Sequence, residues 1–129
     1  MTKGRILLVA FLCVVLAIAA FVGYVYWSLS RTYPNPLPPL VQSFSMTNNE
    51  FNQRIYERFP LGSSESALMQ ELRGEGFKET TQHPVPEFRA MQLLGSKFPC
   101  KLRWLVLWKA DRSGNITDRL GMYGEVGCF

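Results

Sequence analysis

The pattern of hydrophobic and polar positions divides the chain into two different parts. Residues 6–27 form an unbroken apolar run without one charged side chain. As an α-helix this run is about 33 Å long, enough to cross a hydrocarbon core of about 30 Å. From residue 47 onward, apolar residues recur at helix and strand spacings between polar ones, which is typical of a globular domain. The pattern therefore predicts an N-terminal transmembrane helix followed by a small domain.

The domain is predicted to begin with a helix that starts at Thr47 and ends at Pro60. Thr47 and Glu50 form a capping box, and Met46 and Phe51 occupy the two hydrophobic-staple positions around it. Three apolar residues then recur every four positions on one face of this helix: Phe51, Ile55 and Phe59. A stripe with this spacing is typical of a helix that packs against a core.

A second helix is predicted after Gly62-Ser63-Ser64, where either serine can provide the N-cap. Leu68 and Leu72 form its apolar face, and Gly76 ends it. A helix N-terminus beside a glycine can also bind an anion. An ordinary cap is the better interpretation, because no glycine-rich loop or lysine follows.

The rest of the domain has strand character. Residues 77–82 predict a short edge strand, residues 83–86 a loop, and residues 88–94 either a strand or a short helix. In residues 101–109 every second side chain is large and apolar, which predicts a strand with its core face formed by Leu102, Trp104, Val106 and Trp108. Residues 111–115 have turn chemistry. A return strand follows, with one face formed by Ile116, Leu120, Met122 and Val126.

These elements together predict an α+β fold. An N-terminal transmembrane helix is followed by a small domain of two helices packed on an antiparallel sheet of three to four strands. We expect residues 1–31 to be the membrane anchor and residues 44–129 to be the domain. Residues 32–43 contain four prolines between Pro34 and Pro39, which predicts a stiff, extended spacer.

The charges around the apolar run predict its orientation. Lys3 and Arg5 precede it, whereas only Arg31 follows closely, so the positive-inside rule places the N-terminus in the cytoplasm. We therefore expect a single-pass protein of the inner, cytoplasmic membrane with a periplasmic or otherwise extracytoplasmic domain. A cleaved signal peptide is the alternative, because Ala17-Ile18-Ala19 fits a cleavage pattern. Cleavage there would leave eight apolar residues at an exposed new N-terminus.

The predicted topology also determines the expected redox state of the cysteines. Cys100 and Cys128 are the only cysteines beyond the anchor, and an exported domain folds in an oxidising compartment. Folding the chain about Ser113 brings position 100 opposite about position 126, and a single bulge or a slightly longer loop is expected to shift this to 128. We expect an intramolecular disulfide, with two unpaired thiols or an intermolecular bridge through Cys128 as the alternatives. Cys13 is interpreted as a small apolar residue in the membrane.

Composition and motifs exclude several classes of function. The net charge of +4 comes mostly from residues 1–31, and residues 32–129 hold eleven basic against ten acidic side chains. We therefore expect no nucleic-acid binding. His83 is the only histidine, which excludes a multi-histidine metal site. A lone histidine with scattered acids and no G-x-S-x-G motif indicates no catalytic triad. Asp111, Ser113 and Asn115 lack the downstream glutamate of a calcium loop and fit a turn better. We expect no cofactor and no enzymatic activity.

Binding a protein partner is the remaining class. Trp104 and Trp108 share one face of the predicted strand and are interpreted as core, with a sugar or peptide platform as the alternative. The opposite face is the candidate partner surface, and its five residues are Lys101, Arg103, Lys109, Arg119 and Tyr123. Plain solvation of these charges is the alternative.

Three features resemble small envelope domains of the SmpA/OmlA (BamE-like) and β-lactamase-inhibitor-protein type. They are the Gly62-Ser63-Ser64 helix start, the Leu68–Leu72 helix ending in Gly76-Phe77, and the Trp108, Asp111, Gly114 and Ile116 hairpin. The resemblance covers about residues 47–126, and the chain lacks the lipobox of the lipoprotein family. It implies the fold and a habit of binding proteins. We therefore expect a membrane-tethered module that binds another protein, as an envelope assembly factor or as an accessory factor. The alternative is an inhibitor or immunity protein against a toxin or hydrolase in the same compartment.

Overall fold

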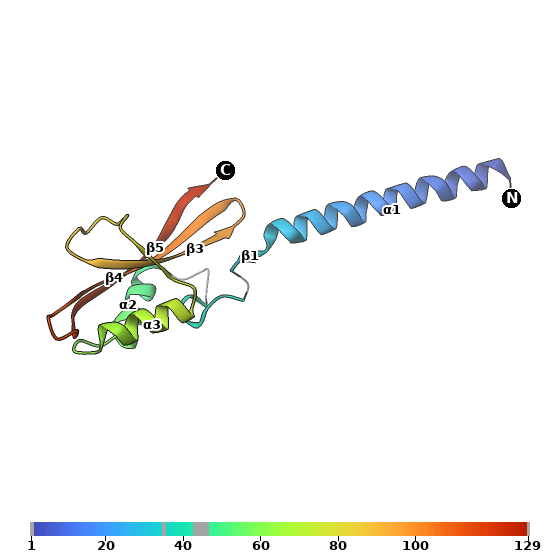
Figure 1. The fold of residues 1–129 in the computed structure, drawn as a ribbon. Helices are drawn as coiled ribbons and strands as arrows, with labels where there is room; N and C mark the ends of the chain where they lie inside the picture. The colour runs from blue at the N-terminus through green and yellow to red at the C-terminus, as the bar shows by residue number, and fades with distance from the viewer. Residues whose placement is uncertain (1, 35, 43–46, 129) are drawn as a thin grey trace. The chain divides into compact units, whose positions relative to one another are not determined.

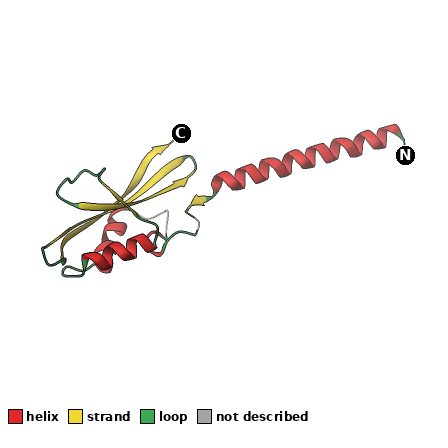
Figure 2. Cartoon of the chain, viewed as in Figure 1, coloured by secondary structure: helices red, strands yellow, loops and turns green. Residues whose placement is uncertain are grey.

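The computed structural model describes residues 2–34, 36–42 and 47–128. The chain divides into two compact units, residues 1–31 and residues 32–129. The first unit holds helix α1 (Lys3–Ser30), and the second holds all other helices and strands (Figure 1). Helices and an antiparallel sheet make up the second unit (Figure 2). The predicted α+β fold is confirmed.

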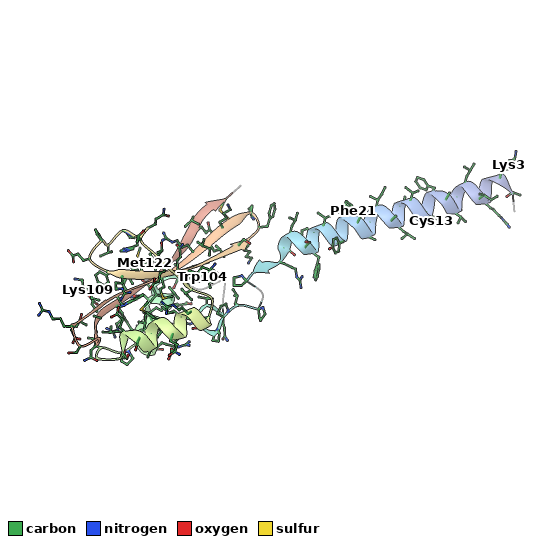
Figure 3. All side chains as sticks on the ribbon, in the orientation of Figure 1. Lys3, Cys13, Phe21, Trp104, Lys109 and Met122 are labelled. Atoms are coloured by element: carbon green, nitrogen blue, oxygen red, sulfur yellow. A yellow bond between two sulfur atoms is a disulfide. The ribbon has the colours of Figure 1, made fainter. Side chains whose placement is uncertain are left out.

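Helix α1 is long and apolar enough to cross a membrane. It extends the apolar run by one turn at each end, and none of its side chains is buried within the unit. The side chains of Lys3, Cys13 and Phe21 project outward along its length (Figure 3). Near its C-terminus the Arg31 guanidinium lies 4.2 Å from the centre of the Trp27 ring. An apolar helix without a buried face needs an apolar environment, which a bilayer supplies.

Two helices cover one face of the sheet, and both begin as the sequence predicts. Helix α2 (Asn48–Arg58) is capped by the Thr47 hydroxyl, which accepts a hydrogen bond from the Glu50 N–H at 3.2 Å. Its predicted staple residue Met46 lies outside the described residues. Helix α3 (Glu65–Gly74) is capped by Ser64, whose hydroxyl accepts from the Ala67 N–H.

The end of α3 is a Schellman motif. The Phe77 N–H donates to the Leu72 carbonyl at 2.9 Å, and the Gly76 N–H donates to the Arg73 carbonyl at 3.1 Å. Gly76 has φ of +95°, a conformation that glycine adopts without a steric penalty. The motif turns the chain so that the buried Phe77 side chain returns to the core.

Three long strands form the sheet: β3 (Arg89–Lys97), β4 (Cys100–Ala110) and β5 (Ile116–Cys128), each antiparallel to the next. Residues 88–94, left open between helix and strand, are thus mostly strand. Two short strands pair with the outer edge of β3. They are β2 (Lys78–Thr80), opposite Ala90–Gln92, and β1 (Thr32–Tyr33), opposite Ser96–Lys97.

The main core lies between the sheet and the two helices. It contains the three stripe residues of α2, Leu68 and Leu72 of α3, and both tryptophans of β4. Trp104 is 0% exposed and Trp108 is 1% exposed, so their predicted place in the core is confirmed.

The proline-rich segment also contributes to this core. A 3-10 helix, η1 (Pro39–Val41), buries Leu40 and Val41. The Leu40 N–H donates to Glu75 Oε1 at 2.8 Å, and its carbonyl accepts from the Arg54 guanidinium at 3.3 Å. The segment is predicted to be a stiff, extended spacer, and part of it instead packs against the domain as a 3-10 helix. Burial of the Leu40 and Val41 side chains stabilises the folded state through the hydrophobic effect. The neighbouring prolines restrict the backbone of this segment.

Two β-bulges set the register between β4 and β5. At the first bulge Ala110 pairs with Ile116 and Lys109 pairs with Asp118, so Thr117 has no partner on β4. At the second bulge, near the other end of the strands, Val126 has no partner on β4 for the same reason. The first bulge reverses which side chains of β5 face the helices. The predicted alternation for this strand is therefore wrong beyond Ile116, because Leu120 and Met122 face away from the helices and pack with Leu105 and Leu107.

Helix α2 protects the free edge of β5. The Asn52 side-chain carbonyl accepts from the Gly121 N–H at 2.9 Å, and that of Asn48 accepts from the Tyr123 N–H at 2.8 Å. These two asparagines are four residues apart, so they lie on one face of α2. An exposed strand edge is a template for pairing with other chains, and the helix removes part of it. Close contact requires Gly121, since a Cβ there would lie 2.7 Å from Ile55 Cγ1.

This contact predicts that Gly121→Ala destabilises the domain by about 1–3 kcal/mol, the range typical of overpacking. The new Cβ would also lie 3.2 Å from the Asn52 Cα, so backbone would have to move. The measurement is urea unfolding of the full chain in detergent, followed by tryptophan fluorescence. Gly124→Ala on the same strand is the matched control, because its Cβ would meet nothing within 4 Å. Equal midpoints for the two variants would contradict the proposed close packing.

Candidate functional site

The structure divides the five predicted partner-surface residues between the two faces of the sheet. Lys101, Arg103 and Lys109 lie on the face away from the helices, with Leu105 and Leu107. Arg119 is opposite Trp108 and Tyr123 is opposite Trp104, so both lie on the helix face. The expectation that all five share one face is wrong, and the bulge at Thr117 is the reason.

Arg119 binds the end of helix α2. Its Nε donates to the Phe59 carbonyl at 2.9 Å, and its Nη2 donates to the Tyr56 carbonyl at 3.4 Å. The last carbonyls of a helix have no partner within the helix, and a cation there also complements the helix dipole. The guanidinium also lies 4.5 Å from the centre of the Tyr56 ring. Arg119 therefore has a structural role.

Tyr123 extends the core at the edge of the sheet. Its ring stacks on Trp104 with centroids 5.4 Å apart. Partial burial, and after it the negative charge of Glu125, raise the pKa of the Tyr123 hydroxyl. The hydroxyl therefore stays protonated at neutral pH.

The face away from the helices is covered by the β2–β3 loop, residues 81–88. Ala90, Leu105 and Leu107 are buried there, and Val85 and Phe88 of the loop pack against them. Met122 of β5 joins this second cluster, whereas Trp104 belongs to the core on the other face (Figure 3 labels both). Strand β4 is thus buried on both faces.

Two of the predicted surface residues hold this loop in place. Arg103 donates from Nε to Gln92 Oε1 at 2.8 Å and from Nη2 to the Gln82 carbonyl. Lys109 Nζ lies 3.1 Å from Glu87 Oε2 and 5.0 Å from the centre of the Phe88 ring. The two ends of the loop are therefore tied to β4 by side chains of β4 itself. Lys101 is exposed.

A hollow of about 770 Å³ lies between this loop and strands β2 and β3, and we call it the loop groove. Its lining includes Thr80, Gln82, His83, Phe88 and Gln92. The Nδ1 atom of His83 is buried and has no hydrogen-bond partner among the described residues. Such an atom is costly to leave unpaired, so it favours a ligand that hydrogen-bonds to it.

An ion-pair network borders the groove. Glu65, the first residue of α3, accepts hydrogen bonds at Oε1 from Trp108 Nε1 at 3.0 Å and from Arg89 Nη1. Arg89 also lies 3.6 Å from Glu79, which pairs with Arg73 at 3.4 Å. These charges are largely balanced at the border, and His83 Nδ1 is a buried, unpaired polar atom in the lining of the groove.

The sequence did not indicate the loop groove, although two signals point toward it. Leu105 and Leu107 alternate with the core residues of β4, and a strand that is apolar on both faces is typically covered on both. Val85 and Phe88 are apolar residues in a proline-containing loop. Together they indicate a loop that packs against the sheet.

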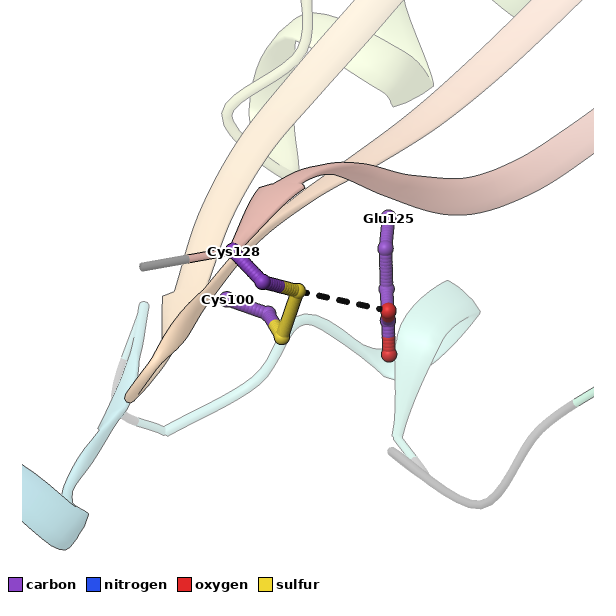
Figure 4. Close-up of a disulfide and its surroundings, with 3 residues drawn as sticks. All are labelled: Cys100, Glu125 and Cys128. Atoms are coloured by element: carbon purple, nitrogen blue, oxygen red, sulfur yellow. Dashed lines mark hydrogen bonds between the residues drawn. A yellow bond between two sulfur atoms is a disulfide. The ribbon is translucent and has the colours of Figure 1, made fainter.

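The other predicted pair, Cys100 and Cys128, is joined in a disulfide (Figure 4). The residues are direct partners at the ends of β4 and β5, with Cα atoms 4.0 Å apart, just below the expected range of about 4.4–6.8 Å. Two bulges, not one, bring position 128 opposite position 100. Glu125 lies close by, with its Oε2 3.5 Å from Cys128 Sγ. Cysteine, glutamate and cysteine could hold a metal ion, but both sulfurs are used in the disulfide.

Comparison of the chain with protein-family models, with curated protein sequences and with solved structures finds no match. The resemblance to BamE-like and inhibitor-protein-like domains therefore stays a prediction.

The disulfide predicts equal losses of stability for Cys100→Ser and Cys128→Ser. In the chain-entropy model, opening a loop with a sequence separation of 28 costs about 3–4 kcal/mol. The double variant should cost little more than either single one, because all three lack the same bond. Thermal unfolding without reductant measures this. Two reactive thiols in the unfolded, unreduced protein, with Cys13 replaced by serine, would contradict the bond.

Proposed function

We propose that this chain is a membrane-tethered, extracytoplasmic interaction module that binds a protein partner in the loop groove and catalyses no reaction. Residues 6–27 hold it in the inner membrane with the N-terminus in the cytoplasm. The partner is an envelope component that the module helps to assemble or serves as an accessory factor. The observation that carries the proposal is a preformed groove containing the unpaired His83 Nδ1 atom.

The anchor and the disulfide both support the location. Helix α1 has the length and composition of a membrane span, and Lys3 and Arg5 lie before its apolar run. The Cys100–Cys128 pairing supports an oxidising compartment, where disulfides of secreted and periplasmic proteins persist.

The restrained loop supports binding at the groove. Arg103 and Lys109 tie the loop to β4 at its two ends, so the groove exists before a partner arrives. A preformed site avoids the entropy cost of ordering a loop on binding. The lining mixes the Phe88 ring with amide, hydroxyl and imidazole groups, which suits a segment of protein with both apolar and polar side chains.

The Nδ1 atom of His83 is not part of a hydrogen-bonded catalytic pair among the described residues. A catalytic histidine needs a hydroxyl, thiol or carboxylate within hydrogen-bond reach. Within residues 2–34, 36–42 and 47–128, no such group is bonded to His83 Nδ1. The acids nearest the groove, Glu65 and Glu79, are engaged in ion pairs with Arg89.

The topology predicts that alkaline phosphatase fused to the C-terminus is active in a bacterial host, because the enzyme needs an oxidising compartment. A fusion of green fluorescent protein at the same position should stay dark after export through the general secretory route. The mass of the mature chain should include residues 1–19. The reverse pattern of activity would contradict the orientation, and loss of residues 1–19 would show a cleaved signal peptide instead.

The groove predicts site-selective crosslinking to one protein. A benzoylphenylalanine at Gln82, which is a lining residue of the groove, should give a discrete adduct in whole cells, whereas one at Arg112 in the β4–β5 turn should not. Gln82 bonds to Arg103 only through its backbone carbonyl, so the probe leaves that bond in place. The identity of the adduct separates an envelope component from a toxin or hydrolase.

A matched pair of variants tests whether the tied loop matters. Arg103→Gln removes the charged tie to the Gln82 carbonyl and should weaken the adduct. Arg112→Gln removes the same charge from the exposed β4–β5 turn, outside the groove lining, and should leave the adduct at position 82 unchanged. Equal adducts at positions 82 and 112, or an unaltered adduct with Arg103→Gln, would contradict binding at the groove.

A further inference from the structure

The β3–β4 turn carries an exposed aromatic side chain between two lysines. Phe98 is 55% exposed, and Lys97 and Lys101 on either side are exposed as well. Val126 of β5, beside the partner of Lys101, is 56% exposed. We call Lys97, Phe98, Lys101 and Val126 the sheet tip. Exposed apolar residues next to basic ones are typical of surfaces that bind anionic lipid.

The disulfide makes the sheet tip a defined surface. Cys100 and Cys128 join β4 to the end of β5 directly behind the turn. The C-terminal end of β5 is therefore held against the hairpin. Phe98 and Val126 are presented from a covalently closed end of the sheet, with little freedom to lose on docking.

The chain leading out of the membrane is attached at this same end of the sheet. Thr32 pairs with Lys97, the residue before Phe98. Helix α1 ends at Ser30, so two peptide units, about 7 Å of chain, lead from its last residue to Thr32. Tyr24, Tyr26 and Trp27 lie at the C-terminal end of the apolar run, and aromatic rings favour the membrane interface. Residues 28–31 are therefore expected in the interfacial layer, which is about 5–8 Å thick on each side. This short connection keeps the sheet tip within reach of the lipid headgroups whatever the orientation of the domain.

We propose that the sheet tip is a second membrane contact: Phe98 and Val126 insert into the interfacial layer of the bilayer, and Lys97 and Lys101 bind anionic phospholipid headgroups. The contact rests on insertion of α1, which gives the tip a high effective concentration at the bilayer, so a weak intrinsic affinity suffices. Glu125 carries a negative charge at this end of the sheet, with its Oε2 3.5 Å from Cys128 Sγ, and it opposes the attraction in part. The two lysines outnumber it.

Docking at the sheet tip turns a tethered domain into an oriented one. Strand β4 runs about 34 Å from Cys100 to Ala110, so its far end points into the compartment when the tip lies on the bilayer. The loop groove lies toward that far end, since its lining includes Trp108 and Phe88. A partner in the aqueous compartment then reaches the groove without competition from the membrane.

Tryptophan quenching by brominated lipid tests the contact in the full chain. The protein, with Trp27→Phe and Phe98→Trp, is reconstituted in phosphatidylcholine–phosphatidylglycerol vesicles at a ratio of about three to one, with and without dibrominated acyl chains. Trp104 and Trp108 stay shielded because they are buried in the core. The emission of the new tryptophan should fall in brominated vesicles. Leu61→Trp in the same background is the control, because Leu61 is 57% exposed and lies far from the sheet tip. The next residue, Gly62, donates its N–H to the carbonyl of Ile116. Ile116 pairs with Ala110, at the end of β4 opposite Cys100.

The lysines are tested in the same vesicles. Neutralising Lys97 or Lys101 to glutamine should lower the ratio of docked to undocked protein about fivefold for each lysine. Pure phosphatidylcholine vesicles should show a similar loss. Quenching that is equal for the tryptophans at positions 98 and 61 would overturn the docking. Quenching at position 98 that is indifferent to both lysines and to anionic lipid would overturn the headgroup contact.

Alkaline extraction of the vesicles reports insertion of α1 separately. If the protein resists extraction while position 98 is unquenched, the tip proposal fails and the anchor stands. If the protein is extracted, the proposed anchor fails, and the tip contact that rests on it fails as well.

Discussion

Burial of β4 on both faces is the constraint on which the rest of the domain depends. Its side chains alternate between two tryptophans on one face and two leucines on the other, and all four are buried. A domain of about a hundred residues has little apolar surface to spare, so each face needs its own cover. Helices α2 and α3 cover the tryptophan face, and the β2–β3 loop covers the leucine face. The proline-rich segment adds Leu40 and Val41 to the larger core.

The second cover explains the position of the groove. A loop covers a sheet less completely than a helix does, because its polar backbone must find partners as well. Arg103 supplies one partner by binding the Gln82 carbonyl, and Lys109 holds Glu87 at the other end. Between these two ties Val85 packs against the sheet, and a hollow lined in part by His83 remains beside strands β2 and β3. Arg103 and Lys109, predicted from the sequence to contact a partner directly, thus instead fix the loop that borders the groove.

The two ends of the sheet have different properties. The end formed by the Cys100–Cys128 disulfide receives β1 and therefore the chain from the anchor. At the opposite end the β4–β5 turn is tied to the start of α3 through the bridge between Ser64 and Asn115. A membrane contact at the first end and a protein contact in the loop groove are compatible, because the two sites use different residues. Together the two proposed contacts would hold the domain at the membrane and leave the loop groove open to a partner.

The sequence by itself determined the elements that depend on local chemistry. The apolar run, the caps at Thr47 and Ser64, the stripe of α2 and the alternation of β4 each lie within one segment, and α+β follows from their order. The pairing of Cys100 with Cys128 could also be predicted from the sequence, because these are the only two cysteines beyond the anchor. Only the tertiary structure decided which face Arg119 and Tyr123 occupy, since one extra residue at Thr117 reverses the alternation and leaves no clear local signal. It also decided that Leu40 and Val41 join the core and that a loop covers the second face of β4, because burial depends on residues brought together from distant parts of the chain.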